Sequence, residues 1–433
     1  MEDPKEMVEV TEERVAPSAA RLTESLRDIG YDTPTAIADL IDNAIAAGAR
    51  EVHVDFEFHG RDSAIVVSDD GEGMPINGLH EALRFGSRRD YKPGELGRFG
   101  LGLKTASFSQ CRRLTVLSKY RRGRGSVNRR TLDLDLVAAR DEWLIHEGQA
   151  SAVVRERDAQ LGATGSGTTV VLENLDRVLN ERTANSGVGK RRLKNASTKV
   201  AEHLSVVFHR YLSGSAAAGK VNIIVDGQKL KAWDPFASTC EQTQLLPGQV
   251  FSITVDGTAH DVRVQRYVLP AKNEFDTVEE FDALSGPLKW NRQQGLYFYR
   301  VDRLVQFGGW SGLRGLDEHT KLARASIDFP TELDVAFQLN VAKMKINLPP
   351  EIRPMLEKPI QELCIHAGER YRRAGGEDRV HSTKKSAGET DLLAVGVALR
   401  AAALRSGGLE SLEKTLKLLK ETSPSIYRNL GLM

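Results

Sequence analysis

The sequence lacks several features that would place it in a specialised class of protein. Its 433 residues contain three cysteines, Cys111, Cys240 and Cys364, whose number and wide spacing exclude a disulfide framework or a Cys-x-x-Cys zinc site. No run of about 18 apolar residues is present, and the acidic start does not resemble a signal peptide. The net charge of +1 identifies no partner by its sign. These absences predict a soluble, cytoplasmic protein with no membrane partner.

The composition is otherwise that of an ordinary globular chain, with 40% hydrophobic and 27% charged residues. The length predicts about two or three domains. Linker-like stretches over 213–219 and 375–390 suggest where the chain divides. We expect five segments, which are a flexible N-terminal arm (1–17), a first α/β domain (18–212), a second α/β domain (220–374), a linker (375–390) and a helical tail (391–433).

Apolar spacing predicts the elements of both domains. In the first, helices are expected over 18–29, 33–48, 103–110 and 199–211, and strands of a mainly antiparallel sheet over 51–58, 63–68, 113–120, 127–136 and 168–173. The second of these helices is the best marked, with Thr33 as its cap, Pro34 at its first position and Gly48 as its stop. In the second domain, strands are expected over 221–225, 250–255, 261–269 and 295–305, and a helix over 351–373.

Acidic and amide side chains share one face of the well-marked helix. Asp39 and Asn43 are four residues apart, and Asp42 lies beside them. Such groups next to an apolar stripe are unusual unless they line a cleft. For this helix alone, a solvated surface is an equally good interpretation.

Asp69 ends an apolar strand candidate and is followed by Asp-Gly-Glu-Gly-Met. Gly71 and Gly73 allow the backbone to approach a planar ligand closely, and the Asp69 carboxylate can accept a hydrogen bond from an exocyclic amine such as that of adenine. A simple turn between two strands explains the same segment, because Asp-Gly is a common hairpin signal.

A glycine-rich segment precedes the helix expected at 103–110. Its glycines are Gly94, Gly97, Gly100 and Gly102. Backbone N–H groups at a helix start can bind phosphates, and Lys104 adds a positive charge. The segment is not a P-loop, because Leu103 separates Gly102 from Lys104. It is not a dinucleotide fingerprint either, because no strand directly precedes it and Gly-x-Gly-x-x-Gly is absent.

Taken in order, these three elements resemble the motifs of the GHKL ATPases, which include gyrase B subunits, heat-shock-ninety-type chaperones, histidine kinases, MutL proteins and MORC proteins. Residues 167–170, Gly-Thr-Thr-Val, resemble the later Gly-Thr element of that superfamily. Residues 295–305 and 339–345 resemble the transducer domain of MORC-like and MutL-like members. The resemblance implies an α+β fold: a Bergerat-type α/β sandwich with a mixed, mainly antiparallel sheet covered by helices on one face, followed by a second, transducer-like α/β domain.

The resemblance also implies ATP and Mg²⁺ as cofactors and a role for each matching residue. Asn43 would hold Mg²⁺, and Asp39 would activate the attacking water. Asp69 would accept from adenine N6 with support from Thr168, and Lys343 would contact the γ-phosphate from the second domain. The other nucleotide-binding candidates are Gly71, Gly73, Met74, Gly97, Arg98, Phe99, Gly100, Leu101, Gly102, Leu103 and Lys104, the last near the γ-phosphate.

Two positions depart from the pattern of the superfamily. Asp39 stands where most members have a glutamate, and its side chain is one methylene shorter, so hydrolysis is expected to be slow. Ala46 stands where many members carry a further aspartate, which is not one of the usual ligands of the metal or the water.

In similar proteins, ATP drives dimerisation and domain rearrangement, and residues 1–30 are a candidate for the exchanged arm. The basic segments 112–130 and 190–199 are candidates for binding duplex DNA, although a solvated surface explains either one alone. The preferred interpretation is therefore an ATP-gated clamp on DNA. The alternative is a chaperone-like or scaffold ATPase switch with a protein client. A kinase-type member is disfavoured, because no phospho-acceptor helix precedes the nucleotide domain.

Overall fold

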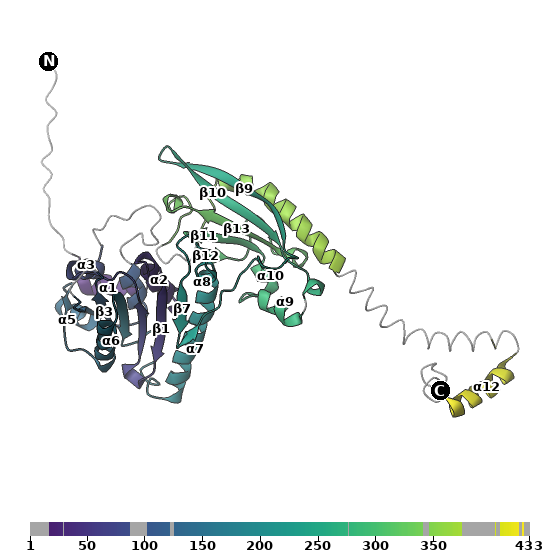
Figure 1. Ribbon diagram of the computed structural model, residues 1–433, viewed down its shortest axis with the longest axis horizontal. Coiled ribbons are helices and arrows are strands. Elements are labelled where there is room, and N and C mark those ends of the chain that lie inside the picture. The colour runs from purple at the N-terminus through teal and green to yellow at the C-terminus, as the bar shows by residue number, and fades with distance from the viewer. Residues whose placement is uncertain are drawn as a thin grey trace, which may run out of the picture.

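Two α/β parts follow one another along the chain and lie side by side (Figure 1). The computed structural model describes residues 17–28, 30–86, 102–121, 125–275, 277–340, 346–374, 403, 408–423 and 427. Within these ranges, no helix is both long enough and apolar enough to cross a membrane.

The first part is built on an eight-stranded sheet in the order β5-β4-β3-β6-β2-β1-β7-β8. Its strands are β1 (Glu51–Glu57), β2 (Ala64–Asp69), β3 (Arg113–Lys119), β4 (Asn128–Asp133), β5 (Ile145–His146), β6 (Gly167–Glu173), β7 (Asn222–Val225) and β8 (Gln228–Lys229). Only β1 and β7 pair in parallel, and every other neighbouring pair is antiparallel. The predicted fold class, a mixed and mainly antiparallel sheet with helices, is confirmed.

Helices cover this sheet mainly on one face. They are α1 (Ala19–Arg27), α2 (Thr33–Ala46), α3 (Ile76–Leu83), α4 (Gly102–Phe108), α5 (Leu134–Arg140), α6 (Ala152–Ala163), α7 (Gly187–Val207) and α8 (His209–Ser213), with a 3₁₀ turn η1 (Gly60–Asp62). The apolar stripe of α2, including Ile37 and Ile41, packs with α7 against the inward side chains of the sheet. One correction is needed: α6 covers the opposite face, where Val154 and Leu161 pack on the alternate residues of β2, β3 and β6.

The second part contains a five-stranded sheet in the order β12-β11-β13-β10-β9. Its elements are β9 (Gln244–Val255), β10 (Thr258–Val268), η2 (Lys272–Glu274), α9 (Val278–Leu284), α10 (Lys289–Gln293), β11 (Gly295–Arg300), β12 (Arg303–Phe307), η3 (Glu318–Thr320), β13 (Ala323–Phe329) and η4 (Thr331–Leu333). Residues 352–374 form a helix that shares this part's apolar core. A separate helix, α12 (Leu409–Thr422), lies within the predicted tail.

The predicted boundary between the two domains is wrong. The strand expected to open the second domain is β7, which pairs in parallel with β1 and completes the first sheet. The preceding stretch, 213–219, is a turn in which Gly214 and Gly219 take positive φ. Small residues that suit a linker also suit a tight turn, so composition alone did not separate the two. The first part therefore extends through β8.

Three smaller expectations also need correction. Asp32, rather than Thr33, caps α2, because its side chain accepts from Thr35 N. The helix expected over 199–211 starts at Gly187, capped by Ser186, and ends at Val207, with α8 following. The strand expected over 127–136 ends at Asp133, whose carboxylate caps α5.

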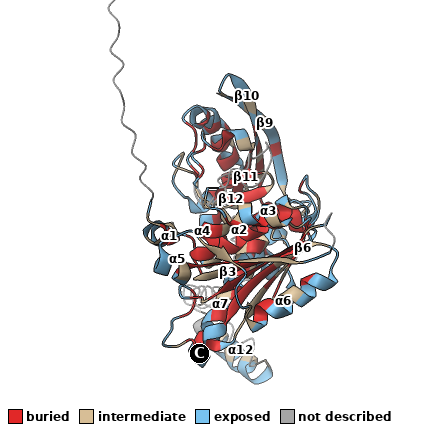
Figure 2. Ribbon diagram, turned by 90° about the vertical axis from the view of Figure 1, so that its left-hand side faces the viewer, coloured by how far each residue is buried: buried red, intermediate tan, exposed pale blue. Residues whose placement is uncertain are grey.

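The two parts meet along α7, α8 and the β11–β12 hairpin. Val206 of α7 packs with Tyr297, Tyr299 and Leu304 of the second sheet. His209 Nε2 lies 2.7 Å from Tyr299 Oη in a buried hydrogen bond. Figure 2 shows α2 and α4 coloured as buried where the two parts adjoin. Residues at this junction are therefore within reach of both parts.

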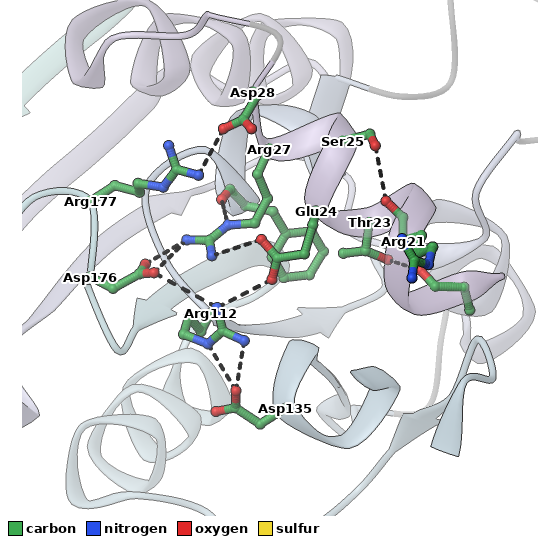
Figure 3. Close-up of polar contacts among 12 residues, drawn as sticks. Arg21, Thr23, Glu24, Ser25, Arg27, Asp28, Arg112, Asp135, Asp176 and Arg177 are labelled. Carbon is green, nitrogen blue, oxygen red and sulfur yellow. Dashed lines mark hydrogen bonds and ion pairs between the residues drawn. The ribbon is translucent and has the colours of Figure 1, made fainter. Parts of the chain in front are cut away.

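Helix α1 is fixed to the first part by a buried arginine (Figure 3). Arg27 is 3% exposed; its Nε donates to Phe108 O at 2.8 Å, and its Nη2 donates to both oxygens of Asp176 at 2.6 and 2.8 Å. Arg112 extends this network to Glu24 and Asp135. Residues 18–28 are thus docked within their own chain, so only residues 1–16, which lie outside the described ranges, keep the expectation of an exchanged arm.

Candidate nucleotide-binding site

The acidic face of α2 lies at the junction of the two parts. Asp39 and Asp42 are 2% and 1% exposed, whereas Asn43 is exposed. The solvated-surface interpretation is therefore wrong for the two acids. Tyr31 Oη donates to Asp39 Oδ2 at 2.7 Å, and burial, followed by the charge of Asp39, raises the pKa of the Tyr31 hydroxyl. Tyr31 therefore remains a hydrogen-bond donor to this carboxylate at all physiological pH values.

An arginine from the second part reaches the same acids. Arg303, at the start of β12, places Nη2 3.5 Å from Asp39 Oδ1 and Nε 2.9 Å from Asp42 Oδ1. The Nε contact has no hydrogen-bond geometry and is an ion pair. Burial, followed by the charge of Arg303, lowers the pKa of His203 on α7 to about 4, so that imidazole is neutral. Sequence reasoning included Arg303 in the transducer-like segment but gave it no role, because only the tertiary structure brings it to α2.

Asp69 lies at the end of β2, opposite Thr168 of β6 in the antiparallel register. Its Oδ1 accepts from Gly71 N at 2.9 Å, and the backbone N–H of Thr168 also donates to the carboxylate. Burial nevertheless raises the pKa of Asp69 from 3.8 to about 6, with these backbone hydrogen bonds opposing the shift. The Thr168 hydroxyl shares a hydrogen bond of 3.0 Å with Ser118 Oγ.

The neighbouring Asp70 has a structural role. Its Oδ1 accepts from Arg50 N at 2.7 Å and from Glu51 N at 2.9 Å, so it fixes the start of β1. The interpretation of this segment as a hairpin turn is wrong, because β2 pairs with β1 and β6 and the chain continues from Asp69 into α3.

The backbone after Asp69 requires glycine. Gly73 has φ of +69°, and a Cβ at this position would lie 2.1 Å from Lys119 O. At Gly71 a Cβ would lie 2.8 Å from Asp69 Oδ1. The next residue, Met74, donates its N–H to Ser118 Oγ at 2.7 Å, which joins this segment to β3. The glycines thus permit close packing of the chain around Asp69, and the close approach of a planar ligand stays a prediction.

Much of the expected phosphate-binding segment lies outside the described residues. This applies to Gly97, Arg98, Phe99, Gly100 and Leu101, and also to Lys343. The described end of the segment opens α4 at Gly102, where a Cβ would lie 3.8 Å from Asp39 Oδ2. The glycine-rich segment therefore enters the fold beside the α2 acids, and Leu103 packs against the core.

Lys104 has protein partners in this state. Its Nζ donates to Ala82 O at 2.9 Å and to Arg84 O at 2.7 Å, and the side chain is 1% exposed. Burial lowers the pKa of Lys104 to about 8. This lysine joins α4 to the end of α3, and its contact with a γ-phosphate stays a prediction.

Asn43 is the described side chain that fits the expected Mg²⁺. Across the described part of the chain, no group of three or more His, Cys, Asp or Glu side chains is arranged to hold a metal. Mg²⁺ commonly keeps several waters and takes one or two protein ligands together with substrate phosphates. An exposed amide oxygen one turn beyond Asp39 suits that mode of binding.

The two basic segments differ in how their side chains are engaged. In 112–130, the side chains of Arg112, Arg113 and Arg130 pair with Asp135, Asp133 and Glu147, and Lys119 donates to the carbonyls of Gly162 and Thr164. The basic residues of 190–199 are all exposed on α7, and Lys194 pairs with Asp226 at 3.2 Å. Among the described basic residues of the two segments, those of α7 are therefore the more available.

Comparison with known proteins agrees with this geometry. Residues 31–168 match a family described as histidine kinase-, DNA gyrase B-, and HSP90-like ATPase. The chain is 38% identical over 87 residues to the ATPase morc-1 of Caenorhabditis elegans, covering 20% of this chain and 10% of that protein. It is 34% identical over 93 residues to Protein MICRORCHIDIA 5 of Arabidopsis thaliana, covering 20% of this chain and 13% of that protein.

The match thus spans about a tenth of the length of each of these relatives. The family match spans the segment that carries Asp39, Asn43, Asp69 and Thr168. Residues 31–168 of this chain are therefore similar to the ATPase domain of the GHKL superfamily, with a MORC-like pattern.

Proposed function

We propose that this chain binds ATP with Mg²⁺, hydrolyses it slowly, and uses the cycle to close a homodimer on duplex DNA. The observation that carries the proposal is the convergence of three features in one ATPase domain. These are the buried Asp39 with the exposed Asn43 on α2, the partly buried Asp69 beside two required glycines, and the glycine-rich segment that enters beside Asp39.

In this proposal Asp69 recognises adenine. The ionised carboxylate accepts from the exocyclic amine, while Gly71 and Gly73 let the backbone pack closely around this carboxylate. Thr168, whose backbone donates to Asp69, holds the carboxylate in place. Adenine specificity then follows from a single buried acceptor that discriminates against bases without a donor at that position.

Asp39 orients and deprotonates the attacking water, and Tyr31 holds one of its oxygens. Asn43 holds Mg²⁺, which supplies charge neutralisation at the phosphates when it is bound. Phosphoryl transfer to water needs positioning and charge stabilisation more than covalent chemistry, so few catalytic side chains are required. Because aspartate reaches less far than glutamate, turnover is slow.

The glycine-rich segment and Lys343 contact the γ-phosphate in the ATP state. A phosphate touched from both parts of the molecule favours one arrangement of those parts, and hydrolysis releases it. The exposed basic surface of α7 supports duplex DNA as the partner. A protein client, as for a chaperone-like or scaffold ATPase, is the alternative.

The test is the solution mass of the full chain with and without a non-hydrolysable ATP analogue and Mg²⁺. We expect a shift from monomer to dimer that Asn43→Ala abolishes and that Asn195→Ala, an exposed asparagine on α7, leaves intact. Duplex DNA is then added to both states, and tighter binding by the dimer supports the clamp. Nucleotide binding with unchanged mass favours the alternative. Failure to bind nucleotide contradicts the whole proposal.

A further inference from the structure

One arginine of the second part is buried against the acidic face of α2. Arg303 is 2% exposed, and its guanidinium lies between Asp39 and Asp42 at the distances given above. Buried carboxylates are stable as ions only when positive charge or hydrogen-bond donors face them. Arg303 brings positive charge to both acids, and it belongs to the part that does not contain them.

The β11–β12 hairpin directs Arg303 toward α2. The two turn residues, Val301 and Asp302, have φ of +50° and +61°, as in a two-residue type I′ turn. A β-branched residue in this region is strained, so neighbouring contacts must fix it. Tyr211 Oη donates to Val301 O at 2.5 Å, and Ala217 N donates to Asp302 Oδ2 at 2.8 Å. The first part therefore fixes the turn that delivers the arginine.

The two oxygens of Asp39 face different neighbours. Oδ1 faces Arg303. Oδ2 accepts from Tyr31 and lies 3.8 Å from the Cβ position of Gly102, where the glycine-rich segment enters α4. A carboxylate is planar, so a partner on one oxygen sets the direction of the other. The orientation of the oxygen at the phosphate end of the site thus depends on the cation at the opposite end.

We propose that Arg303 is a positioning residue for ATP hydrolysis, orienting Asp39 toward the attacking water only while the second part is docked. The inference rests on the proposed ATPase function and adds a coupling device to it. Displacement of the second part removes Arg303 from α2, and Asp39 then loses its orientation. Asp39 is therefore oriented to act as a base only when the second part is docked.

The experiment compares Arg303→Met and Arg303→Lys with a matched control, Arg266→Met, in the full chain. Arg266 is also a buried arginine of the second part, 3% exposed, and its partners Pro247, Pro359 and Glu362 lie in that same part. We expect Arg303→Met to lower kcat at least about 50-fold while the Kd of a non-hydrolysable ATP analogue changes less than about threefold. Arg303→Lys recovers part of kcat, and Arg266→Met stays within about fivefold of the wild type.

A second variant separates folding from positioning. Arg303→Met leaves two buried acids without their cation, whereas Asp42→Asn combined with Arg303→Met removes one of those charges. We expect the double variant to recover the thermal transition of the wild type but not its kcat.

Three results contradict the inference. Unchanged kcat in a folded Arg303→Met protein, or equal losses in the Arg266 and Arg303 variants, overturns positioning by Arg303. Recovery of kcat together with folding in the double variant does the same. A wild-type protein without ATPase activity overturns the proposed function and this inference with it, whereas an active wild type with insensitive variants overturns the inference alone.

Discussion

At the scale of single residues, Asp69 and Asp70 have the same side chain but opposite roles. Asp69 is partly buried beside Thr168 and Gly71, whereas Asp70 accepts from two backbone N–H groups at the start of β1. We expect Asp69→Asn to weaken ATP binding by about 10- to 100-fold, because a charged acceptor is lost. Asp70→Asn is the matched control. It should lower the free energy of unfolding by about 1 kcal/mol and leave ATP affinity unchanged. Calorimetric titration and urea unfolding of both variants check this, and equal losses of affinity would contradict the assignment.

The raised pKa of Asp69 predicts a pH dependence of nucleotide binding. Its carboxyl titrates near pH 6 in the folded protein, against 3.8 for the ordinary group. If adenine requires the ionised form, ATP affinity falls as pH decreases below about 6, by about tenfold per unit, and is flat above about 7. The raised pKa of Asp69 has the opposite effect on the free energy of unfolding in the absence of ATP. Because the folded pKa is raised, this group's contribution to stability without ATP is full below about pH 4 and is lost as pH rises through about 6.

Titrations with ATP between pH 5 and 8 measure the first effect, and urea unfolding over the same range measures the second. Asp69→Asn serves as the control and should flatten both profiles. A wild-type profile of ATP affinity that stays flat across pH 6 would contradict recognition by an ionised Asp69.

Local sequence was enough to predict Asp39, Asn43, Asp69, Gly71 and Gly73 as site candidates, because the motifs that contain them span only a few residues, and their roles stay predictions. It could not identify Arg303 or Tyr31. Arg303 is 264 residues from Asp39, and its role exists only because the β11–β12 hairpin docks on the first part. Lys104 shows another limit of prediction from local sequence. Its motif suggests a phosphate ligand, whereas in the structure its Nζ donates to the carbonyls of Ala82 and Arg84.

At the scale of elements, Arg27 joins α1 to the rest of the first part. The guanidinium is buried, donates to the last residue of α4 and pairs with Asp176, which is 27% exposed (Figure 3). We expect Arg27→Met to lower the free energy of unfolding by about 2 kcal/mol, because a partly buried carboxylate and a carbonyl lose their donor.

The control is Arg177→Met, on the surface pair with Asp28, which should change stability by less than about 0.5 kcal/mol. Urea unfolding and hydrogen exchange of the α1 amides provide the measurements. Unchanged protection of α1 in Arg27→Met would show that the helix does not rely on this contact.

The elements themselves were predictable where periodicity was strong. The expected strands at 51–58, 63–68, 113–120 and 168–173 match β1, β2, β3 and β6 within one or two residues. The predictions failed where the same composition suits two kinds of structure. The helix expected to begin at 199 begins at Gly187, because the first half of α7 carries many exposed polar and basic residues, and small residues at 213–219 indicated a linker but form a turn.

At the scale of the whole molecule, the first sheet and the helices on it form a unit that β7 and β8 complete, and the second sheet docks on α7 and α8. Pairing of β7 with β1 joins residues about 170 positions apart, which no local pattern reveals. The exposed side of α7, away from the sheet, carries the basic residues of 190–199. Helix α7 therefore packs against the second part near its C-terminal end, at Val206, and exposes positive charge along residues 190–199.

The different engagement of the basic side chains in segments 112–130 and 190–199 predicts which segment binds DNA. Each phosphate contact that is lost should reduce the slope of log K against log salt by about 0.9. We expect the triple variant Lys190→Gln, Arg191→Gln, Arg192→Gln to reduce the slope by about 2 to 3 units. The triple variant Arg112→Gln, Arg113→Gln, Arg130→Gln removes the same charge from side chains that already pair with carboxylates, so its slope should change by less than about 1.

Binding to a duplex measured from 50 to about 200 mM salt, with the ATP analogue and Mg²⁺ present, checks the prediction. Equal reductions of the slope in both triple variants would mean that only net charge matters and that α7 is not the preferred DNA-binding surface. If the wild-type protein shows no salt-dependent affinity for duplex DNA, the basic surface of α7 is a solvated face and the partner of the ATPase is a protein. The slope therefore distinguishes the DNA clamp from the protein-client alternative, because only a polyanion releases counterions in proportion to the cations that contact it.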